Sequence, residues 1–212
     1  MKQTVKVKIC GITRPEDALA AETAGADAIG LIFAARSKRR VTLQQAQAIC
    51  TGLGPFTARV GVFVDAPLDA VLDTVRQLRL SAVQLHGDET ADYAETVRRD
   101  VQVIRAVSFS SELDVAALSN FPADAILLDG LVPGSGEAFS WAAAAALRGF
   151  PKLILAGGLT PSNVGAGIRA LEPYAVDVAS GVESTVGIKN HLKIQDFVRH
   201  AKNSLNSEVI HR

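Results

Sequence analysis

Eight short apolar segments, each followed by a polar turn and a helical pattern, constrain the fold more than any other feature of the sequence. The segments are rich in valine and isoleucine and leave little room for hairpins, which is typical of a parallel sheet covered by helices. A doubly wound open sheet usually has about five or six strands, so eight repeats favour a closed barrel. The sequence therefore predicts a single-domain α/β fold, a (βα)8 TIM barrel. Its strands are expected at residues 5–9, 28–33, 58–64, 82–85, 101–107, 125–128, 153–156 and 175–178.

Capping patterns mark the start of two of the intervening helices. Thr13 with Glu16, and Thr42 with Gln45, have the spacing of a capping box. These two helices are expected to end near residues 24 and 51. Further helices are expected from the turn at 65–67 to 78, up to 98, at 111–118, at 141–148, from 160 and at 189–202.

The length and composition fit one catalytic domain. The chain has 212 residues, 48% of them hydrophobic, which is enough to bury a full core. It is shorter than the usual barrel of about 250 residues, so its loops must be short. We expect the barrel to occupy residues 1–204 and the tail, 205–212, to be frayed.

Charge and hydropathy exclude several classes of partner. The formal net charge is zero and the isoelectric point is near 6.9, so there is no basic stripe for nucleic acid. No apolar run approaches the roughly 20 residues of a membrane span, and the polar start MKQTVKVK is unlike a signal peptide. We expect a cytoplasmic protein without nucleic-acid or membrane partners.

The two cysteines, Cys10 and Cys50, lie far apart and have no partners at metal-ligand spacing. In a cytoplasmic protein they are expected to be free thiols rather than a disulfide. Cys50 falls on the apolar face of a predicted helix, which indicates core packing. No metal site is expected.

Two turns of small residues end the last two strands. Gly157 and Gly158 follow the seventh strand, and Ala179-Ser180-Gly181 follows the eighth. Such residues let a ligand approach the backbone, and amides at a helix start favour an anion. Glycines after strands are also ordinary turn residues. Because phosphate sites recur after the last two strands of TIM barrels, we predict a phosphate cup here.

Three strands end in a titratable residue followed by glycine, at Cys10, His86 and Asp129. A thiolate at Cys10 can act as a nucleophile or general base if nearby cations lower its pKa, although a small apolar role is the alternative. Asp129 ends the apolar run ILLD, where burial would raise its pKa and suit a general acid; a cap for the next loop is the alternative. His86 is either a ligand contact or a structural histidine.

Cationic side chains also map to the strand ends. Lys8 lies two residues before Cys10 on the same side of the strand, and Asp177 on the eighth strand is its expected partner. Arg105 belongs to the expected fifth strand. A loop after the second strand carries four cations, one of which can bind a carboxylate: Arg36, Lys38, Arg39 and Arg40.

With these residues identified, the chain closely resembles the phosphoribosylanthranilate isomerase family of tryptophan biosynthesis. Sister barrels such as indoleglycerol-phosphate synthase share the phosphate cup but are not expected to carry KICGIT together with QLHGDE. The matching stretches span almost the whole chain in collinear order: KICGIT (8–13), GADAIGLIF (25–33), GVFVD (61–65), VQLHGDE (83–89), LLDG (127–130), GSGEAFSW (134–141), LAGGLTPSNV (155–164) and DVASGVES (177–184).

The resemblance implies an Amadori rearrangement of N-(5-phosphoribosyl)anthranilate to 1-(2-carboxyphenylamino)-1-deoxyribulose 5-phosphate, without metal or cofactor. It assigns the general base to Cys10 and the general acid to Asp129. Arg39, two residues after a serine, would bind the anthranilate carboxylate, with His86 and Arg105 as further residues of the mouth. The implied phosphate ligands are Gly157, Gly158, Ser180 and Gly181. The expected partner is this small phosphorylated substrate, and the expected state is a monomer, with a dimer as the alternative.

The chain departs from its relatives in two places. Where they usually have a stretch like YPKSPRYV, it has AARSKRRV, so Arg40 is the alternative to Arg39. Where relatives often have proline after SGVES, it has Thr185-Val186, from which little effect is expected. A barrel that binds the ligand without turnover is a competing hypothesis. The related sugar isomerisation of histidine biosynthesis is another, but that family uses two aspartates and here the first strand ends in cysteine.

Overall fold

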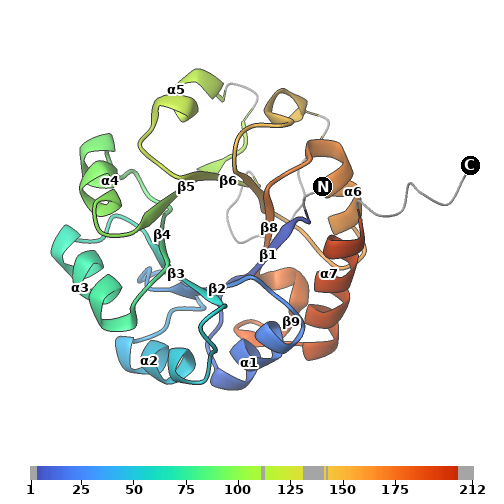
Figure 1. Cartoon of the computed structure of the whole chain (residues 1–212), viewed down its shortest axis with the longest axis horizontal. Coiled ribbons are helices and arrows are strands. Elements are labelled where there is room, and N and C mark those ends of the chain that lie inside the picture. The colour runs from blue at the N-terminus through green and yellow to red at the C-terminus, as the bar shows by residue number, and fades with distance from the viewer. Residues whose placement is uncertain (1–3, 111–112, 131–140, 142, 205–212) are drawn as a thin grey trace, which may run out of the picture.

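Eight parallel strands close into one barrel in chain order, and helices surround it (Figure 1). The computed structural model describes residues 4–110, 113–130, 141 and 143–204. Each strand pairs with the next, and β1 pairs with β8 to close the ring. The strands are β1 (Lys6–Ile9), β2 (Ala28–Ile32), β3 (Ala58–Phe63), β4 (Ala82–Leu85), β5 (Gln102–Ser108), β6 (Ala125–Asp129), β7 (Leu153–Leu155) and β8 (Ala175–Val178). The predicted TIM barrel is confirmed.

Seven α-helices of the described chain cover the barrel. They are α1 (Pro15–Thr23), α2 (Leu43–Thr51), α3 (Leu68–Leu78), α4 (Ala91–Arg98), α5 (Val115–Asn120), α6 (Val164–Leu171) and α7 (His191–Asn203). No helix in the described ranges has the length and apolar character to traverse a bilayer.

The capping box is confirmed for α2 and wrong for α1. Thr42 accepts a hydrogen bond from the Gln45 amide, and the Gln45 side chain accepts one from the Thr42 amide. At α1 the residue before the helix is Arg14, and its side chain makes no capping bond. The Thr13 hydroxyl instead donates to the Gly187 carbonyl oxygen, so a distant loop uses the group that the local pattern assigned to the helix.

Three helices differ from the expected bounds. The one expected from Thr160 begins at Val164, because the Asn163 side chain accepts from the Thr160 amide and donates to the Gly158 carbonyl, which forms a turn. The one expected at 111–118 begins after Asp114, whose carboxylate caps α5. At 141–148 the described residues form only a 3-10 helix, η1 (Ala145–Leu147). Residues 111–112, the glycine-rich loop 131–140 and the tail 205–212 lie outside the described chain.

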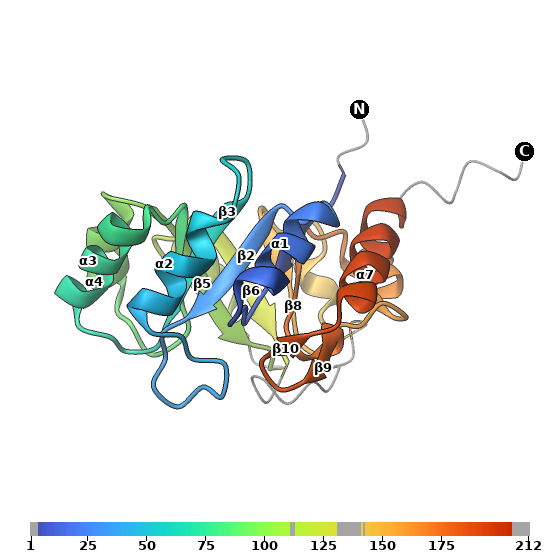
Figure 2. The ribbon, with the colours of Figure 1, turned by 90° about the horizontal axis from the view of Figure 1, so that it is seen from below.

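A short hairpin that the sequence analysis did not predict follows β8. A 3-10 helix, η2 (Ser180–Val182), leads into β9 (Glu183–Thr185), which pairs antiparallel with β10 (Ile188–Lys189). Figure 2 shows this hairpin and the loop between β2 and α2 at the same end of the barrel. That end is where the strands terminate, so the hairpin forms part of the mouth.

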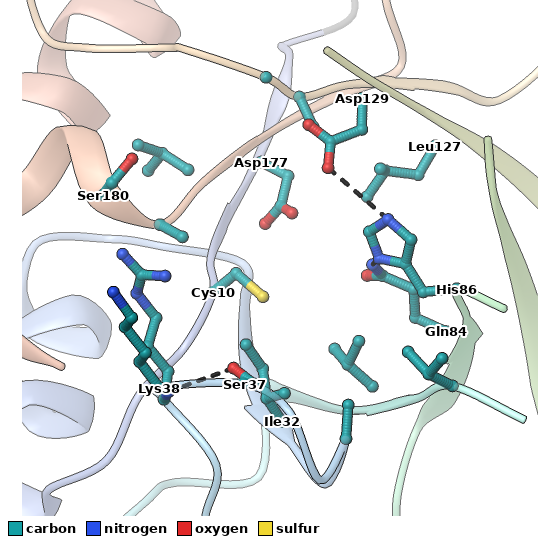
Figure 3. A pocket seen from close by; sticks show the side chains of 18 of the residues that line it. Cys10, Ile32, Ser37, Lys38, Gln84, His86, Leu127, Asp129, Asp177 and Ser180 are labelled. Carbon is teal, nitrogen blue, oxygen red and sulfur yellow. Dashed lines mark hydrogen bonds and ion pairs between the residues drawn. The ribbon is translucent and has the colours of Figure 1, made fainter. Parts of the chain in front are cut away.

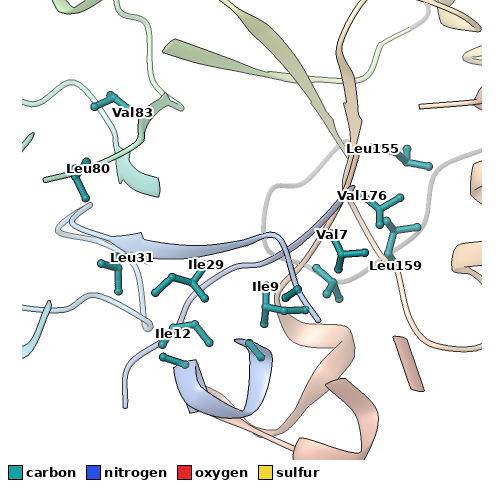
Figure 4. Close-up of a cluster of buried hydrophobic side chains, with 14 of the residues drawn as sticks. Val7, Ile9, Ile12, Ile29, Leu31, Leu80, Val83, Leu155, Leu159 and Val176 are labelled. Carbon is teal, nitrogen blue, oxygen red and sulfur yellow. The ribbon is translucent and has the colours of Figure 1, made fainter. Parts of the chain in front are cut away.

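Two apolar clusters form the core. The larger fills the space between the barrel and the helices and includes Ile9, Ile29 and Leu31, all fully buried (Figure 4). Cys50 belongs to this cluster, as predicted. The smaller cluster contains alternate residues of β3 to β8, and its members Leu127 and Ala156 also line the cavity described below. The barrel interior is therefore packed beneath its mouth.

The Thr42 cap allows a test of the local structure. We expect Thr42→Ala to lower the free energy of unfolding by about 1 kcal/mol, because a helix amide loses its acceptor. Thr51→Ala is the matched control, since Thr51 is an exposed residue at the other end of the same helix, and its effect should stay within about 0.5 kcal/mol. Equal stabilities of the two variants in urea unfolding would contradict the assignment of the cap.

Candidate active site

A cavity of about 550 Å³ opens at the carboxyl ends of the strands, a size that suits a small ligand. Figure 3 shows the side chains of Cys10, His86, Asp129 and Ser180 around it, and these four residues come from different parts of the chain. Of the predicted site residues, Arg105 and Gly181 are not in its lining. The predicted residues that line it are Cys10, Arg39, His86, Asp129, Gly157, Gly158 and Ser180.

Cys10 follows β1 and is buried against Gly30 of β2. A Cβ atom at Gly30 would lie 2.6 Å from the Cys10 sulfur, so the glycine provides the space that the thiol occupies. Burial raises the pKa of the Cys10 thiol above its ordinary value, and the attraction of Lys8 and Lys189 offsets this only in part. The lowering of the pKa by nearby cations that the sequence analysis required is therefore not found, because desolvation outweighs the cations.

Asp129 is the last residue of β6 and is also buried. Its Oδ1 accepts a hydrogen bond of 2.8 Å from the Gly130 amide, and its Oδ2 lies 3.6 Å from His86 Nε2. Burial raises the pKa of the Asp129 carboxyl, while the Gly130 amide and His86 act in the opposite direction. The expected direction of this shift is confirmed, so the carboxyl retains its proton more readily than an exposed one.

Three buried polar side chains lie together at the cavity, Lys8 of β1, Gln84 of β4 and Asp177 of β8. The Lys8 ammonium is 3.0 Å from an Asp177 carboxylate oxygen and 3.0 Å from Gln84 Oε1, and this confirms the predicted Lys8–Asp177 pair. Burial alone would lower the pKa of Lys8, but Asp177 and the Cys10 sulfur raise it and the net shift is upward. The sequence analysis did not predict a role for Gln84. It could have been noticed as a polar side chain within the apolar strand AVQL.

Arg39 reaches the cavity from the loop after β2. Its stem crosses Gly11, where a Cβ atom would lie 2.6 Å from Arg39 Cδ, and Gly11 has a φ of +68°. Its guanidinium forms two hydrogen bonds, of 2.7 and 2.8 Å, with the Glu183 carboxylate. Arg40, the alternative, is exposed and lies outside the cavity lining. The described geometry therefore brings Arg39, and not Arg40, to the mouth.

Glu183 links two segments of the mouth and was not predicted. Besides Arg39, it accepts hydrogen bonds from Lys189 Nζ at 3.0 Å and from the Gly187 amide at 3.2 Å. Burial alone would raise the pKa of Glu183, but Arg39 and Lys189 lower it overall. The carboxylate is thus held ionised and joins the loop after β2 to the hairpin.

Arg105 is held at the side of the mouth. Its guanidinium lies 2.9 Å from a Glu89 carboxylate oxygen and 5.1 Å from the centre of the Phe121 ring. Glu89 also accepts from the amides of Asp65 and Gly87. Arg105 therefore supports the loop after β4 in this structure.

The two small-residue turns lie against each other. Gly157 and Gly158 have φ values of +76° and +65°, and a Cβ atom at Gly157 would lie 2.3 Å from the Gly130 amide nitrogen. A Cβ atom at Gly181 would lie 1.9 Å from the Leu159 carbonyl oxygen, so that position also requires glycine. The amides of Gly158 and Ser180 donate no hydrogen bond to any described residue. Such unpaired amides, with Ser180 at the start of η2, form a suitable anion site.

In the ranges given above, no group of three histidine, cysteine or acidic side chains is placed to hold a metal ion.

Comparison with known proteins decides the family. Residues 7–200 match the family model described as N-(5'phosphoribosyl)anthranilate (PRA) isomerase. The chain belongs to the phosphoribosylanthranilate isomerase family. A relative from Thermotoga neapolitana, named N-(5'-phosphoribosyl)anthranilate isomerase, is 45% identical over 202 residues, which are 93% of this chain and 98% of the relative.

Solved structures of phosphoribosylanthranilate isomerases share the fold. That of the Thermus thermophilus enzyme has a TM-score of 0.87 and 45% identity, covering 92% of this chain and 98% of that one. Another, in complex with reduced 1-(o-carboxyphenylamino)-1-deoxyribulose 5-phosphate, has a TM-score of 0.86 and 42% identity, covering 94% and 99%. A third, of monomers generated from the dimeric Thermotoga maritima enzyme, has a TM-score of 0.86 and 40% identity, with the same coverage.

The burial of Cys10 predicts how its thiol titrates in this member of the family. In a Cys50→Ala background, the ultraviolet absorbance of the thiolate should rise with a midpoint above the ordinary value of about 8.5, because burial disfavours the charged form. The single variant Cys10→Ala, which keeps Cys50, gives the absorbance change of the Cys50 thiol alone. A Cys10 midpoint at or below neutrality would contradict the prediction.

Proposed function

We propose that this chain converts N-(5'-phosphoribosyl)anthranilate to 1-(2-carboxyphenylamino)-1-deoxyribulose 5-phosphate in tryptophan biosynthesis. The observation that carries the proposal is the single cavity lined by Cys10, Asp129 and two small-residue turns, in a chain of this family. A thiol, a carboxyl group and an anion site around one small molecule are what a phosphorylated aldose needs to isomerise by acid and base catalysis.

The phosphate of the substrate occupies the turns after β7 and β8. The amides of Gly158 and Ser180, which donate to no described residue, support this assignment, and Gly157 and Gly181 allow the close approach of the backbone. The anthranilate carboxylate binds to Arg39. Glu183 uses two of the guanidinium's donors, and a guanidinium has five, so further donors are available to the substrate.

Asp129 starts the reaction by donating its proton to the ring oxygen of the ribose. The ring C–O bond breaks and the nitrogen lone pair forms a C=N bond, which gives an open iminium ion. Cys10 then removes the C2 proton. The electron pair of the C2–H bond forms the C1=C2 bond and the π pair of the C=N bond returns to nitrogen, which gives an enolamine. Protonation at C1 and loss of the hydroxyl proton at C2 then give the ketone. The iminium charge acidifies C2–H and also favours a thiolate beside it.

The two pKa shifts describe which protonation state is active. The reaction needs a thiolate with a carboxylic acid, which together carry one proton. Burial raises the pKa of both groups. An ordinary carboxyl loses its proton near about pH 4 and an ordinary thiol near about pH 8.5, so the carboxyl is the first of the two to ionise as the pH rises. Between the two pKa values the pair holds one proton, so kcat/KM should be bell-shaped as a function of pH. The active form is the one with this proton on Asp129, and it is the minor form because the thiol holds the proton more readily.

We also propose a domain boundary and an oligomeric state. Residues 1–204 form the catalytic domain, and the molecule is a monomer, with a dimer as the alternative. Because the Thermotoga maritima relative is described as dimeric, sedimentation equilibrium is the measurement that decides between the two states.

Substitution of the acid and the base tests the roles directly. We expect Cys10→Ala and Asp129→Asn each to remove nearly all turnover, measured by the loss of phosphoribosylanthranilate fluorescence, while circular dichroism shows the fold intact. Full activity in either folded variant would overturn the assignment of that residue. Binding of the substrate by the parent protein without any turnover would instead support the competing hypothesis of a binding protein.

The carboxylate site is tested by two neighbouring arginines. Arg39→Ala should raise KM about tenfold or more, because a charge-assisted hydrogen bond is lost while Glu183 keeps Lys189 as its partner. Arg40→Ala, on the exposed neighbour, should leave KM unchanged. The reverse result would assign the carboxylate to Arg40.

A further inference from the structure

A row of polar side chains connects Lys8 of β1 to Asp129, and its other members are Gln84 and His86, which line the cavity together with Asp129. Lys8 Nζ lies 3.0 Å from Gln84 Oε1, and Gln84 Nε2 lies 3.2 Å from His86 Nδ1. His86 Nε2 in turn lies 3.6 Å from Asp129 Oδ2. Figure 3 shows Gln84 and His86 side by side, with the His86 ring directed at Asp129.

Only one arrangement of hydrogen atoms satisfies this row. The Lys8 ammonium can only donate, so the atom of Gln84 that faces it must be the carbonyl oxygen. The amide nitrogen of Gln84 therefore faces His86 Nδ1 and donates to it, which requires Nδ1 to be unprotonated. Burial lowers the pKa of His86, so the ring is neutral and carries its one proton on Nε2.

The Nε2–H group of His86 has no hydrogen-bond partner in the described part of the chain, although it is buried. The nearest acceptor is Asp129 Oδ2, since Oδ1 already accepts from the Gly130 amide. While Oδ2 carries the acid's proton, two donors face each other across 3.6 Å. Once that proton has left, Oδ2 is a charged acceptor and the same contact becomes a hydrogen bond.

We propose that His86 stabilises the Asp129 carboxylate formed when the acid gives up its proton, and that Gln84 and Lys8 position His86 by fixing its tautomer. His86 keeps its own proton throughout, because the proton given to the ring oxygen comes from Asp129 alone. An interaction that forms only as the charge develops lowers the barrier rather than tightening substrate binding. The inference rests on the proposed function, because it requires Asp129 to be the general acid.

Other charged groups face this pair and bear on its titration. Those that act on His86 are Asp129, Lys8, Asp177 and Glu89, and those that act on Asp129 are His86, Asp177 and Lys8. Lys8 is paired with Asp177, and Glu89 with Arg105. Neither Gln84 nor His86 is a member of the Lys8–Asp177 or the Arg105–Glu89 pair.

The tautomer can be measured without catalysis. The ring ¹⁵N shifts of the free protein, with its four histidines and a His86→Leu spectrum for assignment, should show Nδ1 of His86 unprotonated and Nε2 protonated. Gln84→Glu replaces the donor by an acceptor and should place a proton on Nδ1. Gln47→Glu, with the same charge change at an exposed site of α2, should leave the His86 shifts unchanged. A protonated Nδ1 in the parent protein, or an unchanged ring in Gln84→Glu, would overturn the inference.

Kinetics test the consequence for the acid. His86→Leu should lower kcat about tenfold or more, and the acidic limb of the kcat/KM profile should move to higher pH, because the Asp129 carboxylate loses a donor. His86→Gln, whose amide can place an N–H near the same position, should recover most of the loss. Thermal unfolding checks that each variant folds.

The outcomes separate this inference from the proposed function. If Asp129→Asn is inactive and folded His86→Leu matches the parent in kcat and pH profile, the inference fails and the function stands. If His86→Gln is as slow as His86→Leu, an N–H donor is not what His86 provides, and the inference fails again. If folded Asp129→Asn is fully active, the assignment of the acid itself fails.

Discussion

The buried ion pair of Lys8 and Asp177 is the interaction on which the rest of the site depends. The two residues are direct partners in the register of β1 and β8, where the barrel closes. Two opposite charges inside a barrel are tolerated only when they form an ion pair and their remaining donors and acceptors are hydrogen-bonded. Lys8 meets this condition with Gln84, so the pair fixes the orientation of a neutral amide three strands away.

The same closure explains how distant segments come to share one mouth. Cys10 lies two residues after Lys8, and Ala179 lies two residues after Asp177, so the thiol and the second glycine turn both follow the closing strands. The Gly11 and Gly30 positions then admit the Arg39 stem and the Cys10 sulfur, and Glu183 holds Arg39 from the hairpin. Small residues at these positions are therefore a requirement of close packing at the mouth.

Much of this architecture could be predicted from the sequence because its signals are local. Each strand is a short apolar run, and its observed bounds differ from the expected ones by at most one residue. The Lys8–Asp177 pair followed from counting residues on two strands known to be adjacent once the barrel is assumed. Cys10, His86, Asp129 and the two turns were found because a barrel puts every strand end at one face.

The features that sequence reasoning missed depend on contacts between distant segments. The hairpin of β9 and β10 is too short to show alternation, and Glu183 meets Arg39 across 144 residues of sequence. The expected cap at Thr13 failed because Gly187 uses its hydroxyl. The direction of the Cys10 pKa shift depends on the balance between burial and two lysines, which only coordinates can provide.

The central claim is that the thiol and the carboxyl group act on one substrate from separate strands. A crystal structure of this chain with reduced 1-(o-carboxyphenylamino)-1-deoxyribulose 5-phosphate tests it most directly. We expect C2 of the analogue within about 3.5 Å of the Cys10 sulfur, the C4 oxygen beside the Asp129 carboxyl, and the phosphate on the Gly158 and Ser180 amides. An analogue bound with C2 away from Cys10, or with its phosphate outside the two turns, would contradict the account.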